Sequence, residues 1–435
     1  MLPIQDTVLK LYEHYLTHGG VVTDSRHITP QAIFFALKGL HFDGNTFAKQ
    51  ALDNGAAYAV IDDERYKKDE RYLLVEDAVT ALQRLAHHHR CQLKIPVIGI
   101  TGSSGKTTTK ELLHAVLSCR YTTKATQGNL NNHIGVPLTI LAIDKAVEIA
   151  IVEMGANHVG EIARLCDMAM PTHGLITNIR KVHLEGFGSL AGVQKGKGEL
   201  YDYLRQHQGK VFINSKEPLL CELAVSLEQP MYYPRPQDYY PCELVSADPF
   251  VVYKSENGEV VASQLLGEYH FDNIAAALCV AKYFGVNETA ANEAIKRYQP
   301  SNNRSQLITK GSNTIFLDSY NSNLVSTMGA IQALNALPAT HKVLILGGME
   351  ELGEESEAAH QALGTLTTQA TYKAVLLCGP QMIVAKAANP HALYFPNKED
   401  LVAYLKRQRF EHTALLIKGS RSLQLETLVE HIACE

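Results

Sequence analysis

A glycine-rich stretch between residues 98 and 109 carries the residues best suited to chemistry. It reads Ile-Gly-Ile-Thr-Gly-Ser-Ser-Gly-Lys-Thr-Thr-Thr, with an apolar run before it and a helical pattern after it. Strand, loop and helix start together predict a phosphate cradle, because backbone N–H groups and the helix dipole both favour an anion. Lys106 then suits the β- and γ-phosphates of a nucleotide, and the Thr107 hydroxyl suits Mg²⁺.

The match to the G-x-x-x-x-G-K-[ST] pattern is imperfect, because Ile100 occupies the first glycine position and the glycine follows at 102. A glycine turn before an ordinary helix would not explain the Gly-Lys-Thr-Thr run, so we expect a nucleotide site. Its expected residues are Thr101, Gly102, Ser103, Ser104, Gly105, Lys106, Thr107 and Thr108.

A carboxylate follows a second apolar run. Residues 148–156 read Glu-Ile-Ala-Ile-Val-Glu-Met-Gly-Ala, which predicts a buried strand ending at Glu153. An ionised carboxylate there is costly without a partner, and a Mg²⁺ opposite Thr107 supplies one. The sequence therefore predicts Thr107 and Glu153 as metal ligands.

The elements around these residues predict an α/β protein of three domains. Residues 1–88 alternate short strands and helices, as in a small α/β unit. Residues 89–303 read as repeated strand–helix units, which predict a mostly parallel sheet with helices on both faces. A turn-rich joint at 300–306 leads to residues 304–435, a Rossmann-like region without a G-x-G-x-x-G dinucleotide motif.

Composition and charge argue against several classes of protein. The net charge is −5 and no Lys/Arg-rich run occurs, which argues against nucleic-acid binding. Eight scattered cysteines without C-x-x-C favour free thiols in the cytoplasm. No signal-peptide pattern is seen and no apolar run approaches the ~20 residues that span a bilayer, so no membrane insertion is expected. His87–His89 is interpreted as a solvated helix end.

Several phrases resemble the Mur ligase family. They are T-G-S-S-G-K-T-T at 101–108, G-N-L-N-N-x-I-G-V-P at 128–137, E-M-G-A-N-H at 153–158 and H-L-E-G-F-G-S-L at 183–190. They follow the family's order over essentially the whole chain and are most similar to the branch that adds D-alanyl-D-alanine. The resemblance implies an ATP-dependent ligase, expected to be a monomer, that joins D-Ala-D-Ala to UDP-MurNAc-tripeptide through an acyl phosphate in peptidoglycan synthesis.

The same resemblance implies catalytic roles. Lys106 and Arg304 would contact ATP phosphates, although Arg304 could also be a solvated loop cation. His183 matches a second-metal ligand, which implies two Mg²⁺ ions. Lys197 matches a lysine that several family members carry as a carbamate, and Lys195 lies two residues away.

By resemblance, the substrate contacts spread along the chain. Asn273 and Asp318 would lie beside ATP, at the adenine and the ribose. The substrate residues implied are Ser25, Arg26 and Lys38 for the UDP end, Asn131, Asn132, Asn157 and His158 near the reacting groups, Asn321 and Asn323 lining the site, and His360, Lys418, Ser420 and Arg421 for the dipeptide carboxylate. A strand end followed by a helix start at 418–422 would also form an anion site by geometry. The family phrases are broken at His270, Leu324 and Gly348.

Two other functions remain open. The chain could be a related Mur-type amide ligase with a different amino substrate. It could also belong to another class, as a P-loop protein that uses ATP as a switch.

Overall fold

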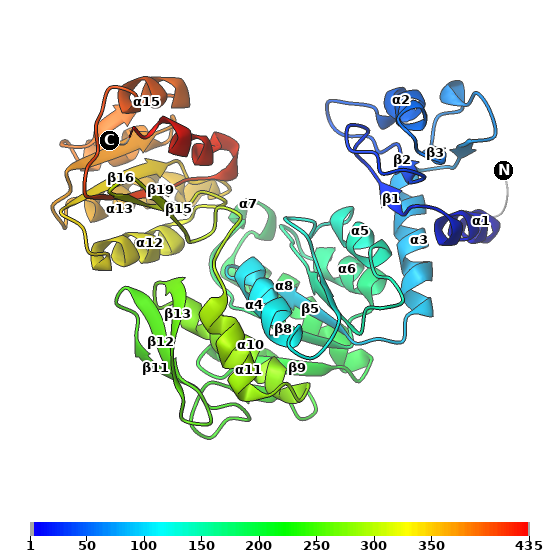
Figure 1. Cartoon of the computed structure of the whole chain (residues 1–435), viewed down its shortest axis with the longest axis horizontal. Helices are drawn as coiled ribbons and strands as arrows, with labels where there is room; N and C mark the ends of the chain where they lie inside the picture. Colours follow the sequence, from blue (N-terminus) through cyan, green and yellow to red (C-terminus); the bar gives the residue numbers. More distant parts are fainter. Residues whose placement is uncertain (1–3, 434–435) are drawn as a thin grey trace.

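The structure is a computed structural model, and it describes residues 4–433. These residues form three α/β bodies, each with its own parallel or largely parallel sheet (Figure 1). The first body (blue) and the third body (yellow to red) lie next to the central one (cyan to green), on the same side of it in this view. The predicted α/β class with three domains is confirmed. No helix within residues 4–433 is long and apolar enough to cross a membrane.

The first body is a four-stranded parallel sheet in the order β1-β2-β3-β4. Alternate strand residues face opposite layers, as the period of two requires. Phe34 and Ile61 pack on the α2 side, whereas Ile33, Phe35 and Val60 pack on the α3 side. The elements are α1 (Ile4–Thr17), β1 (Val21–Val22), β2 (Ile33–Phe35), η1 (Gly44–Phe47), α2 (Ala48–Asp53), β3 (Tyr58–Ile61), η2 (Glu64–Tyr66), β4 (Tyr72–Leu74) and α3 (Ala78–Gln92).

Helix α3 joins the first body to the second, because its buried side chains share one core with α5 and α6. The interpretation of His87–His89 as a solvated helix end is wrong for His89. Its ring is only 7% exposed and donates from Nε2 to the Ile143 carbonyl at 2.9 Å. Residue 89 lies seven after Leu82, so the helical period turns it inward with the apolar face.

The central body is a six-stranded parallel sheet in the order β10-β9-β8-β5-β7-β6. Helices α5, α6 and α8 pack on one face, and α4, α10 and α11 on the other. The strands are β5 (Val97–Thr101), β6 (Thr123–Ala125), β7 (Ile149–Glu153), β8 (His173–Ile176), β9 (Lys210–Asn214) and β10 (Met231–Tyr233). The helices are α4 (Lys106–Leu117), α5 (Gly135–Leu141), α6 (Glu161–Ala169), α7 (Leu184–Phe187), α8 (Leu190–Gln206), α9 (Pro218–Ala224), α10 (His270–Tyr283) and α11 (Glu288–Arg297).

A small antiparallel sheet lies between the central body and the third body. It is formed by β11 (Glu243–Ser246), β12 (Phe250–Lys254) and β13 (Val260–Leu266). Leu266 is fully buried in the apolar core of the third body, with Phe250 packed against that core. The two bodies therefore share apolar contacts as well as the chain connection.

The third body has the sheet order β14-β15-β19-β16-β17-β18, in which only β14 pairs antiparallel. Its strands are β14 (Gln306–Lys310), β15 (Asn313–Asp318), β16 (His341–Gly347), β17 (Ala374–Cys378), β18 (Leu393–Phe395) and β19 (Thr413–Lys418). Its helices are α12 (Leu324–Ala336), η3 (Gly353–Glu355), α13 (Ser356–Leu366), α14 (Met382–Ala388), α15 (Lys398–Leu405), η4 (Arg421–Leu423) and η5 (Leu425–His431).

The helix start expected at 418–422 is wrong, because the segment directly after β19 forms only the three-residue 3₁₀ turn η4. A single 3₁₀ turn does not align enough peptide dipoles to attract an anion. The anion site that we predicted from helix geometry alone therefore has no structural basis.

Candidate active site

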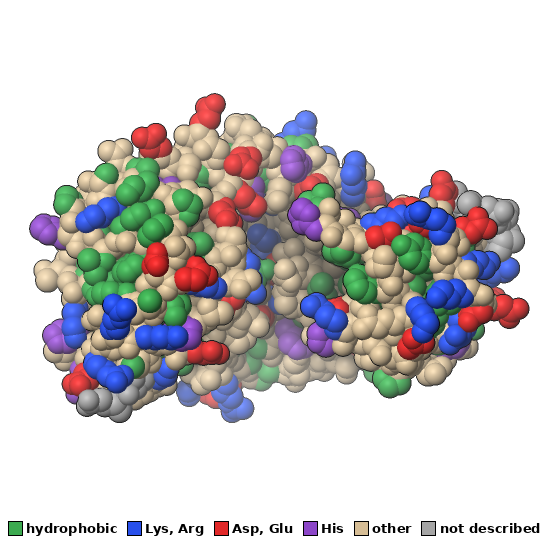
Figure 2. Space-filling view, turned by 90° about the horizontal axis from the view of Figure 1, so that it is seen from above, with side chains coloured by type: hydrophobic (Ala, Val, Ile, Leu, Met, Phe, Trp, Pro, Cys, Tyr) green, Lys and Arg blue, Asp and Glu red, His purple; other side chains and the backbone are tan. Residues whose placement is uncertain are grey.

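A cavity of about 700 Å³ lies between the central body and the third body. It is lined by the phosphate loop, the ends of β7 and β8, the start of α10, the joint near residue 304 and the ends of β15 and β19. Seen from above, the surface is hollowed between the bodies (Figure 2). Carboxyl ends of parallel strands thus face one another across the two bodies, which is where open α/β sheets bind ligands.

The phosphate loop follows β5 as predicted, and two glycines shape it. Gly102 and Gly105 have φ angles of 140° and 80°. A Cβ atom on Gly102 would lie 2.0 Å from Thr177 Oγ1, and one on Gly105 would lie 2.6 Å from Asn273 Oδ1. Only glycine meets both the backbone and the space requirement at these positions.

Lys106 is the first residue of α4 and curls back over the loop. Its Nζ donates to the Gly102 carbonyl at 2.6 Å. Burial lowers the pKa of Lys106, nearby Glu153 opposes that effect, and Arg304 lowers the pKa further. A phosphate between the two cations would favour the charged form of the lysine.

Glu153 lines the cavity, and the buried Thr107 contacts it from behind. Thr107 Oγ1 donates to Glu153 Oε2 at 2.9 Å, and Asn131 Nδ2 donates to Glu153 Oε1 at 2.8 Å. Glu153 is 1% exposed, so these bonds are its compensation for burial. A hydroxyl and a carboxylate in contact are hard oxygen donors that fit Mg²⁺. Within residues 4–433, no group of three or more His, Cys, Asp and Glu side chains could hold a metal ion.

Lys197, and not Lys195, is the buried lysine of α8. Lys197 is 1% exposed, its Nζ donates to the Ala156 carbonyl at 2.8 Å, and it lies 5.1 Å from the centre of the Phe187 ring. Burial lowers the pKa of Lys197 well below its ordinary value. A neutral amine is the form that reacts with CO₂, so this environment fits carbamylation.

His183 pairs across the bodies. It has a left-handed backbone (φ 51°) just before α7, and its Nδ1 pairs with the Glu351 carboxylate of the third body. Lys181 adds a second pair with Glu355 at 2.9 Å. In this arrangement Glu351 occupies one nitrogen of the predicted metal ligand.

The expected nucleotide contacts converge from three segments. Asn273 on α10 accepts from Thr109 Oγ1 at 3.1 Å. The Arg304 guanidinium stacks 3.7 Å from the centre of the Tyr320 ring, so it is not a freely solvated cation. Asp318 ends β15 and lines the same cavity.

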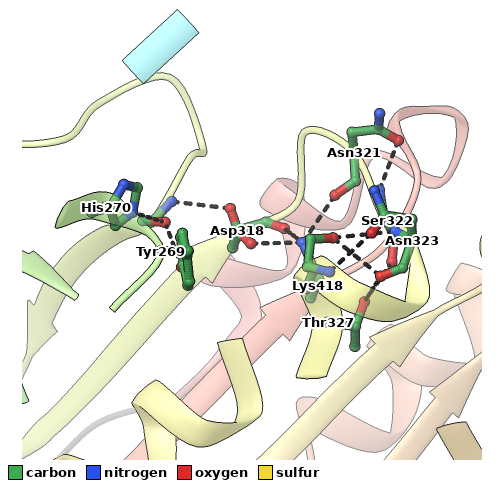
Figure 3. A network of polar contacts seen from close by, with 10 residues as sticks. Tyr269, His270, Asp318, Asn321, Ser322, Asn323, Thr327 and Lys418 are labelled. Carbon is green, nitrogen blue, oxygen red and sulfur yellow. Dashed lines mark hydrogen bonds and ion pairs between the residues drawn. The ribbon is translucent and has the colours of Figure 1, made fainter. Parts of the chain in front are cut away.

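Asp318 and Lys418 form a buried ion pair on neighbouring strands (Figure 3). Lys418 Nζ donates to Asp318 Oδ2 at 2.6 Å and to the Asn321 carbonyl at 3.0 Å. Asn323 caps α12 in a capping box with Ser326. Helix α12 is therefore properly capped, although Leu324 stands where the family phrase has a proline.

The cavity brings together a large part of the predicted residues. These are Ser103, Ser104, Gly105, Lys106, Thr108, Asn131, Asn132, Glu153, Asn157, His183, Asn273, Arg304, Asp318, Asn321, Asn323 and Lys418. Four predicted residues do not line the cavity. They are Thr101 in β5, Gly102 in the loop, Thr107 in α4 and Lys197 in α8.

Other predicted residues lie outside the lining of the cavity. Ser25, Arg26 and Lys38 are on the first body, where Arg26 pairs with Asp24 at 2.7 Å and Lys38 pairs with Asp62 at 2.8 Å. His158 pairs with Glu161 at 3.4 Å. The three first-body residues belong to another surface, whereas His158 lies beside the cavity, because its partner Glu161 lines it.

His360, Ser420 and Arg421 do not line the cavity either. His360 Nε2 accepts from the Met349 N–H at 3.0 Å, and Ser420 Oγ accepts from the Glu350 N–H at 3.1 Å. Arg421 pairs with Glu426. The histidine and the serine thus shape the turn after β16, next to Gly348.

Sequence reasoning missed several side chains of the site. Arg180 lines the cavity and pairs with Glu217, and Tyr320 stacks on Arg304. His270 bonds to Ser305 at the joint. These partners are distant in sequence, so no local motif signals the contacts.

Comparison with known proteins identifies this class of site. Three family models match successive parts of the chain: "Mur ligase family, catalytic domain" over residues 18–90, "Mur ligase middle domain" over 100–281 and "Mur ligase, glutamate ligase domain" over 303–421. The chain therefore belongs to the Mur ligase family, which confirms the resemblance.

Within the family the chain groups with the MurF ligases. It is 34% identical to a Bacillus subtilis protein named UDP-N-acetylmuramoyl-tripeptide--D-alanyl-D-alanine ligase, covering 97% of this chain and 94% of the relative. An Escherichia coli protein of the same name is 35% identical over 95% and 93%. A crystal structure of MurF from Acinetobacter baumannii superposes with a TM-score of 0.83 at 30% identity, covering 95% and 92%. MurF from Thermotoga maritima in complex with ADP gives 0.80 at 27%, covering 96% and 97%.

Proposed function

We propose that the protein joins D-alanyl-D-alanine to UDP-MurNAc-tripeptide at the expense of ATP, giving UDP-MurNAc-pentapeptide for peptidoglycan synthesis. One observation carries the proposal: a single cavity holds the phosphate loop, Glu153 and, from the facing body, Arg304, Asp318 and Lys418. The names of the relatives support the substrates, and the ADP complex of the Thermotoga neighbour supports the nucleotide.

In the first step the terminal carboxylate of the tripeptide attacks the γ-phosphorus of ATP. The bond to the bridging oxygen breaks, leaving ADP and an acyl phosphate. Lys106 and Arg304 offset the negative charge of the transferred group, and the loop N–H groups hold the phosphates. Tyr320 keeps the Arg304 plane oriented toward the cavity that both residues line.

In the second step the dipeptide amine attacks the acyl carbon. A tetrahedral intermediate forms and expels phosphate, which carries away one oxygen of the original carboxylate. Water would hydrolyse the acyl phosphate, so the cavity between the bodies must close on its substrates, with the joint at 300–306 as the turning point. Lys418, Asn321 and Asn323 lie on the facing wall, where the incoming dipeptide would bind.

Magnesium fits the oxygen donors at the base of the cavity. Thr107 and Glu153 would hold one ion, with Asn131 fixing the carboxylate. The ion supplies charge neutralisation and alignment of the phosphates. A second ion would take His183 and a carbamate on Lys197, formed when the neutral amine adds CO₂ and releases a proton. His183 would first have to leave Glu351.

The remaining assignments follow the family. Ser25, Arg26 and Lys38 would contact the UDP end on the first body, and Asn132, Asn157 and His158 would lie toward the reacting groups. His360, Ser420 and Arg421 would act on the dipeptide through the turn that they shape. We place the protein in the cytoplasm as a monomer; the described cysteines, Cys91 to Cys378, are free thiols, as a reducing compartment favours.

The test is phosphate release from Mg-ATP with UDP-MurNAc-tripeptide present and the amine varied. Release that requires D-Ala-D-Ala, with the pentapeptide as product, is the expected result. Phosphate release that requires another amino acid instead would refute D-Ala-D-Ala as the substrate and indicate a Mur-type ligase with a different amino substrate. ATP hydrolysis that depends on neither substrate would favour a P-loop protein that uses ATP as a switch.

A further inference from the structure

His270 occupies a buried position between the nucleotide side of the central body and the interdomain joint. It is 3% exposed and begins α10, three residues before Asn273. Its Nδ1 lies 3.2 Å from Asn273 Nδ2, and its Nε2 lies 3.0 Å from Ser305 Oγ. The residue departs from the asparagine that the family phrase has at this place.

The contacts fix the form of the ring. The amide nitrogen of Asn273 can only donate, so Nδ1 must be the acceptor. The proton is therefore on Nε2, which donates to Ser305 Oγ. Burial lowers the pKa of His270 to about 4, which keeps the imidazole neutral at physiological pH. A neutral histidine ring can accept a hydrogen bond from Asn273 at Nδ1 and donate one to Ser305 at Nε2 at the same time.

The hydrogen bonds continue on both sides. On the nucleotide side, Thr109 Oγ1 of α4 donates to Asn273 Oδ1 at 3.1 Å. On the other side, the Ser305 N–H donates to Asp318 Oδ1 at 3.1 Å, and Lys418 holds the second oxygen of that carboxylate. An unbroken chain of contacts thus runs from the phosphate-loop helix to the sheet of the third body.

The joint at residues 300–306 has a backbone conformation that hydrogen bonds from neighbouring side chains must stabilise. Asn302, Asn303 and Ser305 have φ angles of 61°, 58° and 48°, a left-handed conformation that disfavours non-glycine residues. Tyr269 contributes a second contact to Ser305 Oγ at 3.2 Å. Ser305 is therefore the residue at which central-body side chains fix the backbone of the joint.

We propose that His270 is a positioning residue that couples Asn273, beside the nucleotide, to Ser305 and hence to the placement of the third body. The inference rests on the proposed function for its nucleotide. It predicts that the two ring nitrogens have separable effects: the Nδ1 contact orients Asn273 for ATP, whereas the Nε2 contact sets the joint for attack by the second substrate.

Asparagine and glutamine separate the two contacts. The amide of His270→Asn falls near Nδ1 and retains the bond to Asn273, whereas that of His270→Gln falls near Nε2 and retains the bond to Ser305. We expect His270→Asn to lower kcat about 3- to 10-fold with an unchanged KM for ATP, as loss of one hydrogen bond implies. His270→Gln should raise the KM for ATP by a similar factor with little change in kcat. Ser305→Ala should reproduce His270→Asn, and the double variant should be no worse than either single one.

The matched control is His173→Asn, a partly buried histidine that stacks near Phe212 at the end of β8 away from the cavity. It should lower the thermal midpoint and leave kcat and both KM values unchanged. Small-angle X-ray scattering with Mg-ADP gives a readout besides activity: His270→Asn should broaden the range of interdomain arrangements, and His270→Gln should not. Equal effects of Asn and Gln, or multiplicative effects in the double variant, would overturn the inference. A wild-type protein that binds Mg-ADP without ligating would instead refute the proposed function and leave the scattering test intact.

Discussion

Lys197 is buried and Lys106 is partly buried, and their surroundings give them different chemistry. Lys106 faces Arg304 and the phosphate loop, so a bound anion would favour its charged form. Burial and the nearby positive charge of Lys106 lower the pKa of Lys197, which favours its neutral amine. A bound anion thus suits Lys106 to holding phosphate, whereas burial suits Lys197 to the proposed reaction with CO₂.

Replacement of Lys197 by alanine should abolish ligation, with a loss of at least about 100-fold, because the proposed carbamate ligand of the metal cannot form. Lys197→Arg should be equally inactive, since a guanidinium does not form a carbamate at neutral pH. Binding of ADP, measured by calorimetry, should survive in both. ¹³C NMR with labelled bicarbonate should show a carbamate signal in the wild type alone. Full activity of Lys197→Ala would remove the carbamate from the mechanism.

Replacement of Glu153 by glutamine should weaken Mg²⁺-dependent ADP binding by about 10- to 100-fold, since the site loses its charged oxygen ligand. Binding of ADP without Mg²⁺ should change little. Calorimetric titration with and without Mg²⁺ measures the difference. Glu148→Gln is the control, because Glu148 precedes the same strand and bonds to the Thr122 N–H. An unchanged Mg²⁺ dependence in Glu153→Gln would contradict the metal assignment.

At the scale of elements, the turn from β5 into α4 can be tested through Gly105. Gly105→Ala combines a left-handed φ with a contact to Asn273 Oδ1, whereas Gly160→Ala meets nothing within 4 Å at a similar φ of 91°. Both residues are helix N-caps, so each substitution should destabilise the protein by about 1–2 kcal/mol in urea unfolding. Only Gly105→Ala should also weaken nucleotide binding. Equal nucleotide affinity in the two variants would contradict the fit of loop and Asn273.

The elements predictable from sequence are those with strong local signals. Apolar runs predicted β5 and β7, and the Gly-Lys-Thr-Thr run predicted the start of α4. The failures have physical causes: His89 follows the helical period into the core, and η4 replaces a helix that the Lys-Gly-Ser-Arg run alone could not distinguish from a turn. Polar side chains do not reveal by themselves whether they face water.

At the scale of the whole molecule, the buried His270 and the partly buried His173 predict a pH dependence of stability. Burial lowers the pKa values of His173 and His270 to about 4 from 6.5. Between pH 6.5 and 4 the unfolded chain binds more protons than the native one, so the free energy of unfolding falls as the pH falls. Each histidine contributes up to about 3 kcal/mol of this loss by pH 4.

Urea unfolding at a series of pH values measures this loss. His173→Asn should flatten the curve in this window relative to the wild type, because asparagine does not titrate. An identical slope in the variant and the wild type would show that His173 is not buried in its neutral form.

The sequence predicted the parts of the site that lie within one body, but not the contacts between the bodies. The phosphate loop and Glu153 belong to local patterns, so residue types and spacing alone indicate their chemistry. The pairs that cross the bodies, His183 with Glu351 and His270 with Ser305, join residues far apart in the chain. Their meeting depends on how the bodies pack, which no short motif encodes.

The most direct test of the proposed ligase follows an oxygen atom. UDP-MurNAc-tripeptide labelled with ¹⁸O in its terminal carboxylate is incubated with Mg-ATP and D-Ala-D-Ala, and the released phosphate is analysed by mass spectrometry. Attack of the carboxylate on ATP predicts one ¹⁸O atom in each phosphate, together with UDP-MurNAc-pentapeptide. Unlabelled phosphate, or phosphate released without the dipeptide product, would contradict an acyl-phosphate ligase.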